Sequence, residues 1–271
     1  MRLAVSNIGW PFEFSEQALD KLAELGAEGI EVAPSKVWND TWNISFREAE
    51  KFRKRVEKYD LKVIGFHSLL YDHPELGLFR DKEIEKKTIT FLSRLGSLCA
   101  DLGGYTLVYG SPKGRKRGDI PMNDAMSRAV DFFYEIAESM EREGVSLCIE
   151  PLSTEETDFI DSATQALDLI KRVGHPGFMG QFDTKSLYAA NEIEPAIFEA
   201  FRQVLVHVHV NDPDLVEVGS TGMVDHKKIG ELLKSIKYNR FVSIEQKTID
   251  VMRPLEAVTK SVEKVKKCYL S

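Results

Sequence analysis

The sequence predicts a single (β/α)8 barrel, an α/β fold, spanning residues 1–271. Two observations carry this prediction. Short β-like runs alternate with amphipathic helical segments eight times, with no Pro/Ser-rich linker between them. Several β-like runs also end on a polar residue, as expected where barrel strands open onto a common face. A doubly wound open sheet is the alternative, but its glycine-rich loop is absent after the first strand, where the sequence reads Ser6-Asn7-Ile8-Gly9-Trp10-Pro11.

The eight predicted strands are short apolar runs, rich in Val, Ile, Leu and Phe. They cover residues 2–7, 29–32, 61–67, 105–109, 146–150, 180–183, 204–210 and 241–245. Each is followed by a helical segment with apolar residues at three- and four-residue spacing. Polar caps or prolines are expected to begin seven of these helices, at Ser15, Ser45, Asp81, Asp161, Pro195, Asp225 and Pro254. Glycines are expected to end four of them, at Gly26, Gly103, Gly144 and Gly174.

The composition restricts the class of partner. The formal net charge is -7 and the pI is near 5.5, so neither nucleic acid nor an anionic membrane is expected as a partner. Three cysteines without close pairing are compatible with a reducing cytoplasm, which is the expected location. No apolar run is long enough to cross a bilayer. The sequence does not specify the oligomeric state, and a homo-oligomer is compatible with it.

Four metal-ligating side chains close the last four predicted strands: Glu150, Asp183, His209 and Glu245. Because side chains alternate along a strand and barrel sites lie at the strands' carboxyl ends, these four are expected to converge. A single such residue is more often a helix cap or a solvated loop residue, but four together favour a site. Three carboxylates and one imidazole suit one divalent ion, Mn²⁺, Mg²⁺ or Co²⁺. His207 is expected one layer deeper, donating a hydrogen bond.

With these residues the whole chain resembles the xylose-isomerase-like barrels, which include ketose 3-epimerases, hydroxypyruvate isomerase, inosose dehydratase and the endonuclease IV group. The resemblance is specific for the superfamily and weak for any one activity within it. Its carriers are Gly29-Ile30-Glu31, Phe66-His67-Ser68, Glu150-Pro151-Leu152, Asp183-Thr184, His207-Val208-His209, the Gly219/Gly222/Asp225 turn and Ser243-Ile244-Glu245.

The resemblance implies an enzyme: a metal-dependent isomerase or epimerase of a small carbohydrate or sugar derivative. Glu150, Asp183, His209 and Glu245 would hold the ion, and Glu150 and Glu245 would also be the catalytic acid and base. A proton next to a carbonyl would be abstracted through a metal-stabilised enediolate. Glu156 falls where the ketose 3-epimerases keep a glutamate beside the catalytic one, and it is a candidate for binding substrate.

Two departures from the epimerase pattern put the familiar ketohexose substrates in doubt. Ser186 and Leu215 stand where that group has a histidine and an arginine. The alternative function is a metal-dependent hydrolase or lyase, either an abasic-site phosphodiesterase or an inosose-dehydratase-like enzyme. The nuclease branch is rich in histidine, whereas this chain has six, although Asp225-His226 fits that branch. A barrel that binds a carbohydrate without turning it over is the third reading.

Further residues are candidates for binding substrate. His67 closes the third strand, and Trp10 follows the first, where it would stack on a sugar or simply pack within its loop. Lys113 and Arg115 lie on a glycine-bracketed loop that would bind a phosphate or carboxylate, or would be an ordinary solvated basic loop. Lys185 would replace the missing histidine as a polar contact.

Overall fold

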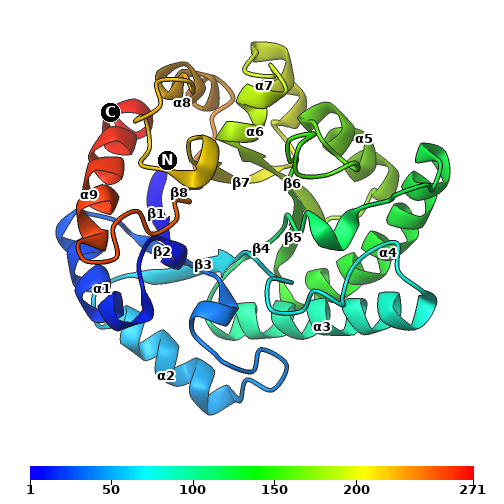
Figure 1. Cartoon of the computed structure of the whole chain (residues 1–271), viewed down its shortest axis with the longest axis horizontal. Helices are drawn as coiled ribbons and strands as arrows, with labels where there is room; N and C mark the ends of the chain where they lie inside the picture. Colours follow the sequence, from blue (N-terminus) through cyan, green and yellow to red (C-terminus); the bar gives the residue numbers. More distant parts are fainter.

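Eight parallel strands close into a barrel in the order β1 to β8 in the computed structural model, which describes all 271 residues. The predicted (β/α)8 architecture is therefore confirmed (Figure 1). The strands are β1 Arg2–Ser6, β2 Gly29–Val32, β3 Lys62–Phe66, β4 Thr106–Tyr109, β5 Ser146–Ile149, β6 Phe178–Asp183, β7 Leu205–Val210 and β8 Phe241–Ile244.

Helices surround the strands on the outside, and a cluster of 65 buried apolar residues lies mainly between the two layers. The helices are α1 Ser15–Glu24, α2 Phe46–Glu57, α3 Lys82–Asp101, α4 Met122–Glu143, α5 Ala163–Val173, α6 Thr184–Ala189, α7 Pro195–Phe201, α8 His226–Ser235 and α9 Pro254–Val265. Short helical turns complete the list: η1 Asn7–Gly9, η2 Phe12–Phe14, η3 Pro34–Lys36, η4 Lys113–Arg115, η5 Pro213–Leu215 and η6 Lys266–Leu270. No helix is both long and apolar enough to cross a membrane.

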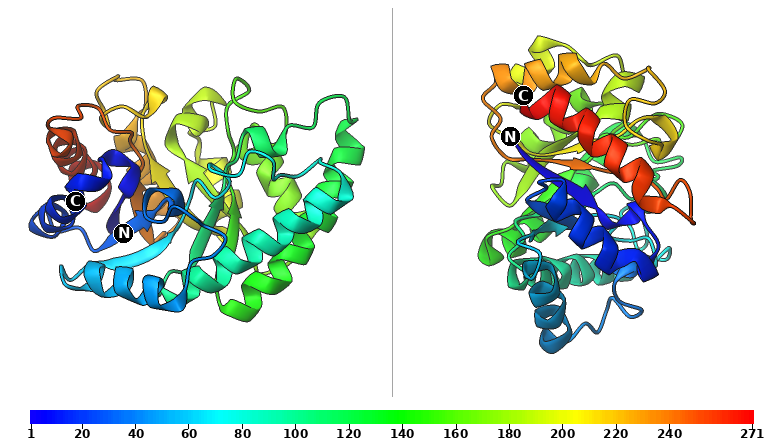
Figure 2. Two further views of the ribbon diagram at one scale, coloured as in Figure 1. Left: turned by 60° about the horizontal axis from the view of Figure 1, so that its bottom comes forward. Right: turned by 90° about the vertical axis from the view of Figure 1, so that its left-hand side faces the viewer.

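Barrel closure joins the two ends of the chain. β1 pairs with β8 through Leu3 and Val242 and through Ala4 and Ser243. Figure 2 shows the last helix, α9, beside the first, α1, over this seam. Ala4, Ile64 and Phe241 form a separate small apolar cluster of strand residues, as expected for a plug inside the barrel.

Most predicted helix ends are confirmed. Ser45 and Glu48 form the predicted capping box, and the side chains of Asp81 and Asp225 accept backbone N–H groups at the starts of α3 and α8. Two starts were wrong. Ser15 is the first helical residue of α1, and its hydroxyl donates to the carbonyl of Phe12 instead of capping. Ser162, one residue after the predicted Asp161, caps α5.

The loop after β7 is fixed by a buried carboxylate. Asp212 is fully buried and lies 2.6 Å from Nε2 of His226, whose Nδ1 lies 2.8 Å from the hydroxyl of Tyr269. Asp212 also accepts the backbone N–H groups of Gly219 and Thr221. Burial alone would raise the pKa of Asp212, but these hydrogen bonds outweigh it and lower the pKa to about 2.

This depressed pKa predicts an acid-dependent contribution to stability. A carboxylate with a lowered folded-state pKa stabilises the fold above its unfolded pKa and loses that contribution as the pH falls through the folded value. Asp212→Asn should therefore lower the free energy of unfolding by about 2 kcal/mol at pH 6. Urea unfolding of both proteins should show the difference shrinking between about pH 4 and pH 2. A difference that does not change with pH would contradict this explanation.

Candidate metal centre

Glu150, Asp183, His209 and Glu245 converge at the carboxyl ends of β5 to β8. Each offers one donor atom, and these four atoms all lie within 4.8 Å of one another. Asp183 and His209 are buried, and the side chain of Glu245 is only 12% exposed. The arrangement follows from strand alternation, since Asp183 and His209 lie on the inner faces of β6 and β7 and Glu150 and Glu245 directly follow β5 and β8. The cluster could hold a metal ion, because its donors are oxygens and one imidazole nitrogen of the type that divalent ions bind.

Amide side chains fix the carboxylates of the cluster. Gln181 donates through Nε2 to Oε1 of Glu150 at 2.7 Å. Asn211 donates through Nδ2 to Oδ2 of Asp183 at 2.6 Å and to Oε2 of Glu245 at 3.0 Å. Sequence reasoning assigned no role to either amide. The signal for Asn211 was its position two residues after His209, which places both on one face of the strand.

Burial and neighbouring charges shift the pKa values of Glu150 and Glu245 in opposite directions. Burial raises the pKa of Glu150, and the negative charges of Glu245 and Asp183 add to this effect. Burial would also raise the pKa of Glu245, but the imidazoles of His209 and His67 outweigh it and hold the pKa well below its usual range. Two carboxyl groups with opposite shifts are an arrangement typical of acid and base pairs.

His67 contacts the carboxylate of Glu245. Its ring is 1% exposed, with Nδ1 3.3 Å from Oε1 of Glu245 and Nε2 2.6 Å from the hydroxyl of Ser6. The structure thus places this predicted substrate residue against a member of the cluster, where it orients the Glu245 carboxylate.

Lys185 and Glu156 form an ion pair next to the cluster. Nζ of Lys185 lies 3.1 Å from Oε2 of Glu156 and 3.8 Å from Oδ1 of Asp183. Burial would lower the pKa of Lys185, but these carboxylates outweigh it and raise the pKa. Lys185 is held here by α6, a short helix that the sequence did not predict. Asp183 caps that helix by accepting the N–H of Ser186 at 2.9 Å.

Arg115 does not face a substrate, which corrects the prediction for this residue. Its side chain is fully buried, donating through Nη1 to the carbonyl of Glu150 at 2.7 Å and through Nη2 to that of Ile160 at 3.1 Å. Burial lowers the pKa of Arg115 to about 10, so it remains charged near neutral pH. Arg115 therefore fixes the backbone that carries Glu150. Lys113, in the same turn, is exposed and remains a candidate for binding an anionic group.

The burial of Arg115 predicts a large effect on stability. Arg115→Met should lower the free energy of unfolding by about 3 kcal/mol, because buried carbonyl oxygens lose their donor. Lys113→Met, in the same turn but exposed, is the matched control and should change it by less than about 0.5 kcal/mol. Urea unfolding of the two variants measures both values. Equal stability of the two variants would show that the hydrogen bonds of the Arg115 guanidinium do not stabilise the fold.

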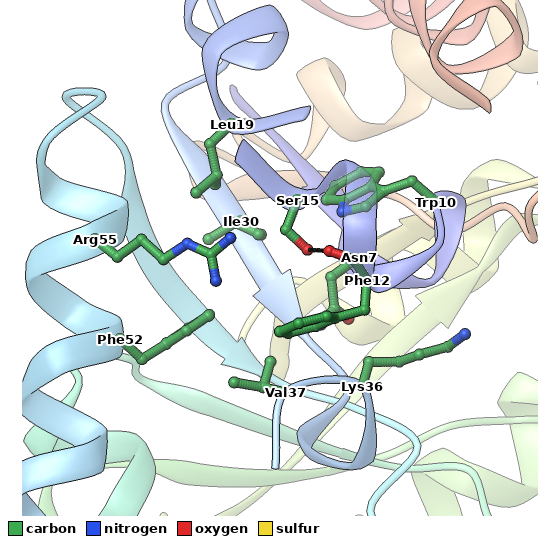
Figure 3. Close-up of a pocket in the computed structure, with 10 residues that line it drawn as sticks. All are labelled: Asn7, Trp10, Phe12, Ser15, Leu19, Ile30, Lys36, Val37, Phe52 and Arg55. Atoms are coloured by element: carbon green, nitrogen blue, oxygen red, sulfur yellow. Dashed lines mark hydrogen bonds between the residues drawn. The ribbon is translucent and has the colours of Figure 1, made fainter. Parts of the chain in front are cut away.

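Trp10 packs on the outside of the barrel. It is 2% exposed and lines a small cavity with residues of α1, β2 and α2 (Figure 3). Figure 3 shows the Arg55 side chain extending from α2 toward this cavity, with Phe12 and Phe52 among its walls. The cavity volume of about 20 Å³ holds one or two water molecules and no sugar ring. The position of Trp10 corresponds to the loop-packing alternative.

Asp225 and His226 do not join the cluster. Asp225 caps α8, and His226 is bound to Asp212 and Tyr269. Ser186, which stands where the ketose 3-epimerases have a histidine, is buried with a hydroxyl that has no hydrogen-bond partner. The Asp225-His226 pair, which fits the nuclease branch, therefore contributes no ligand to the cluster.

The chain is similar in sequence to sugar 3-epimerases. The chain is 22% identical over 200 residues, covering 73% of its length and 72% of the relative, to fructoselysine 3-epimerase of Escherichia coli O157:H7. It is 31% identical over 133 residues to D-psicose 3-epimerase of Ruminiclostridium cellulolyticum, covering 48% of this chain and 42% of that protein.

The fold matches solved structures over its whole length. The structure of D-psicose 3-epimerase with D-tagatose from Clostridium cellulolyticum H10 superposes with a TM-score of 0.83 at 18% identity, covering 99% of both chains. At this identity the likeness shows the fold. The family model described as the xylose isomerase-like TIM barrel matches residues 19–268. The chain, with its closed barrel and its buried carboxylate and histidine cluster, therefore belongs to the xylose isomerase-like TIM barrel family.

Proposed function

We propose that the protein is a divalent-metal-dependent epimerase or isomerase of a sugar or sugar derivative. The observation that carries this proposal is the convergence of Glu150 and Glu245, from β5 and β8, on one imidazole. Nδ1 of His209 lies 3.2 Å from Oε1 of Glu150 and 3.4 Å from Oε2 of Glu245. The sugar 3-epimerases among the relatives support a reaction of this class.

The residues present fit a divalent ion. Glu150, Asp183, His209 and Glu245 would hold it, and three oxygen donors with one nitrogen suit Mn²⁺, Mg²⁺ or Co²⁺. When bound, the ion supplies a Lewis acid that polarises the substrate carbonyl and makes the neighbouring C–H group more acidic.

The two glutamates then move the proton. One carboxylate removes the proton from the carbon next to the carbonyl, and the other returns a proton to the opposite face of that carbon. The configuration at this carbon is thereby inverted. Return of the proton to the adjacent carbon gives aldose–ketose isomerisation instead. His67 and Asn211 hold Glu245, and Gln181 holds Glu150, so that both carboxylates keep fixed positions during the transfer.

Lys185 and Glu156 are proposed to bind the polar groups of the substrate. Together they offer a donor and an acceptor 3.1 Å apart, next to the cluster. Ser186 and Leu215 leave out the histidine and arginine of the ketose 3-epimerase pattern, so a substrate other than a free ketohexose is favoured. A sugar conjugate or sugar phosphate, with its anionic group near Lys113, fits these replacements.

The test is a screen of ketoses, ketose conjugates and sugar phosphates, with chelated protein and with protein reloaded with Mn²⁺. The screen is run in D₂O, so that proton abstraction is detected by NMR even where net conversion is small. Deuterium at a carbon next to a carbonyl, dependent on Mn²⁺, is the expected result. A substrate that turns over in D₂O without taking up deuterium at any carbon would overturn the proposal and favour a hydrolase or lyase.

A further inference from the structure

Glu31 is a fully buried carboxylate on β2 that lies outside the set of four candidate ligands but, with His207 and His209, forms a second group whose donor atoms lie within 4.8 Å of one another. It faces β7, although β1 and β8 separate the two strands around the barrel. Oε1 and Oε2 of Glu31 lie 3.0 and 3.1 Å from Nε2 of His209. Oε1 also lies 3.1 Å from Nε2 of His207, outside hydrogen-bond geometry. Burying an unpaired carboxylate lowers the stability of the fold by several kcal/mol. The contacts of Glu31 with His209 must therefore offset this desolvation cost.

The two nitrogens of His209 face different surroundings. Nδ1 points at Glu150, Glu245 and the amide of Gln181, whereas Nε2 points at Glu31. A neutral imidazole carries its proton on only one nitrogen, and the other nitrogen has the lone pair that binds a metal ion. The hydrogen bond made by one nitrogen therefore decides which nitrogen is free.

Packing fixes the plane of the same ring. The rings of His67 and His207 lie edge-on to His209, with centroids 5.5 and 5.0 Å away and interplanar angles of 81° and 82°. These contacts hold the ring plane but do not distinguish the two nitrogens. The carboxylate of Glu31 distinguishes the two nitrogens, because an ionised carboxylate accepts hydrogen bonds and cannot donate them.

We propose that Glu31 is a positioning residue that accepts the Nε2–H of His209 and so leaves Nδ1 free to bind the divalent ion. This inference rests on the metal centre of the proposed function. It does not depend on the substrate. A carboxylate behind a ligating histidine also increases the basicity of the ligating nitrogen and strengthens its bond to the ion.

The first test compares Mn²⁺ affinities by isothermal titration calorimetry of the full chain. Glu31→Ala should raise the Kd for Mn²⁺ by about 10- to 100-fold. Glu31→Gln should show a smaller increase, because its amide oxygen still accepts the Nε2–H group. The matched control is Asp212→Asn, which alters a buried carboxylate paired with the Nε2 of a different histidine, and it should leave the Kd unchanged within about twofold.

Three outcomes separate the inference from the proposed function. If the parent binds Mn²⁺ and Glu31→Ala binds it equally well, the positioning role is wrong and the metal centre stands. If the parent binds no divalent ion, the metal centre and the role of Glu31 both fall. If Mn²⁺ binds as expected but no sugar is turned over, the role of Glu31 stands without the proposed reaction.

The second test needs no substitution at Glu31, so it does not depend on that variant folding. Protein labelled with ¹⁵N-histidine and loaded with diamagnetic Mg²⁺ should show His209 protonated at Nε2 in long-range ¹H–¹⁵N spectra. The His209→Gln spectrum identifies the resonance by its loss. A His209 ring protonated at Nδ1 in the loaded protein would overturn the assignment.

Discussion

Glu150→Gln and Glu245→Gln are each expected to lower kcat on the true substrate by about 10²- to 10⁴-fold. The glutamine side chain has nearly the same shape as glutamate but can neither take nor return a proton. Replacing either carboxylate with an amide therefore removes the proton-transfer step while leaving the barrel intact. The measurement is steady-state turnover with Mn²⁺ content determined on the same samples, since either substitution also removes one charged donor from the cluster.

Deuterium exchange separates the two glutamates. If the substrate proton is removed by one and returned by the other, a single variant should stop net epimerisation yet still wash solvent deuterium into one epimer. The epimer that exchanges identifies the surviving base. Glu155→Gln is the control, because Glu155 is exposed and next to Glu156 in the same loop, and its kcat should match that of the parent. Both Gln variants near full rate with metal bound would refute the two-base mechanism.

Asp183→Asn and His209→Ala are expected to lose the ion, with a rise of at least about 100-fold in the Kd for Mn²⁺. The parent should bind about one equivalent after chelation and reloading. Asp183 also caps α6, but asparagine is an equally good cap, so Asp183→Asn should change metal binding far more than stability.

The matched control for this prediction is Asp225→Asn. Asp225 is likewise an aspartate that caps a helix, at the start of α8, but it lies outside the cluster. Metal analysis of the three variants and the parent provides the comparison. Parent-like Mn²⁺ content in both Asp183→Asn and His209→Ala would show that the ion, if any, is held elsewhere.

The convergence of the four tip residues followed from the sequence because strand alternation and strand direction are local properties. Glu150, Asp183, His209 and Glu245 each close an apolar run, so a barrel necessarily brings them to one end. Glu31 closes no such run. It lies within β2, and its contact with His209 crosses the barrel, a geometry that local patterns do not encode.

Arg115 and α6 show two other reasons why sequence reasoning failed. A basic residue among glycines resembles one in a solvated loop. The carbonyl of Ile160, which accepts a hydrogen bond from Arg115, lies 45 positions away in the sequence, so no local pattern reveals the contact. Helix α6 spans only Thr184–Ala189, too short to show an amphipathic period. The one local signal for α6 was Asp183. The sequence indicated Asp183 as a metal ligand, and the structure shows that its side chain also caps this helix.

The seam between β1 and β8 has a consequence for synthesis of the protein. Until β8 has left the ribosome, both β1 and β7 present unpaired edges, which are sites for intermolecular strand pairing. Glu245 is also missing until then, so the candidate metal cluster cannot be complete in any nascent chain that lacks the residues up to the end of β8. A ligand that binds only the closed barrel favours it by mass action. Supply of the metal ion during expression should therefore increase the yield of closed barrel relative to aggregated chains.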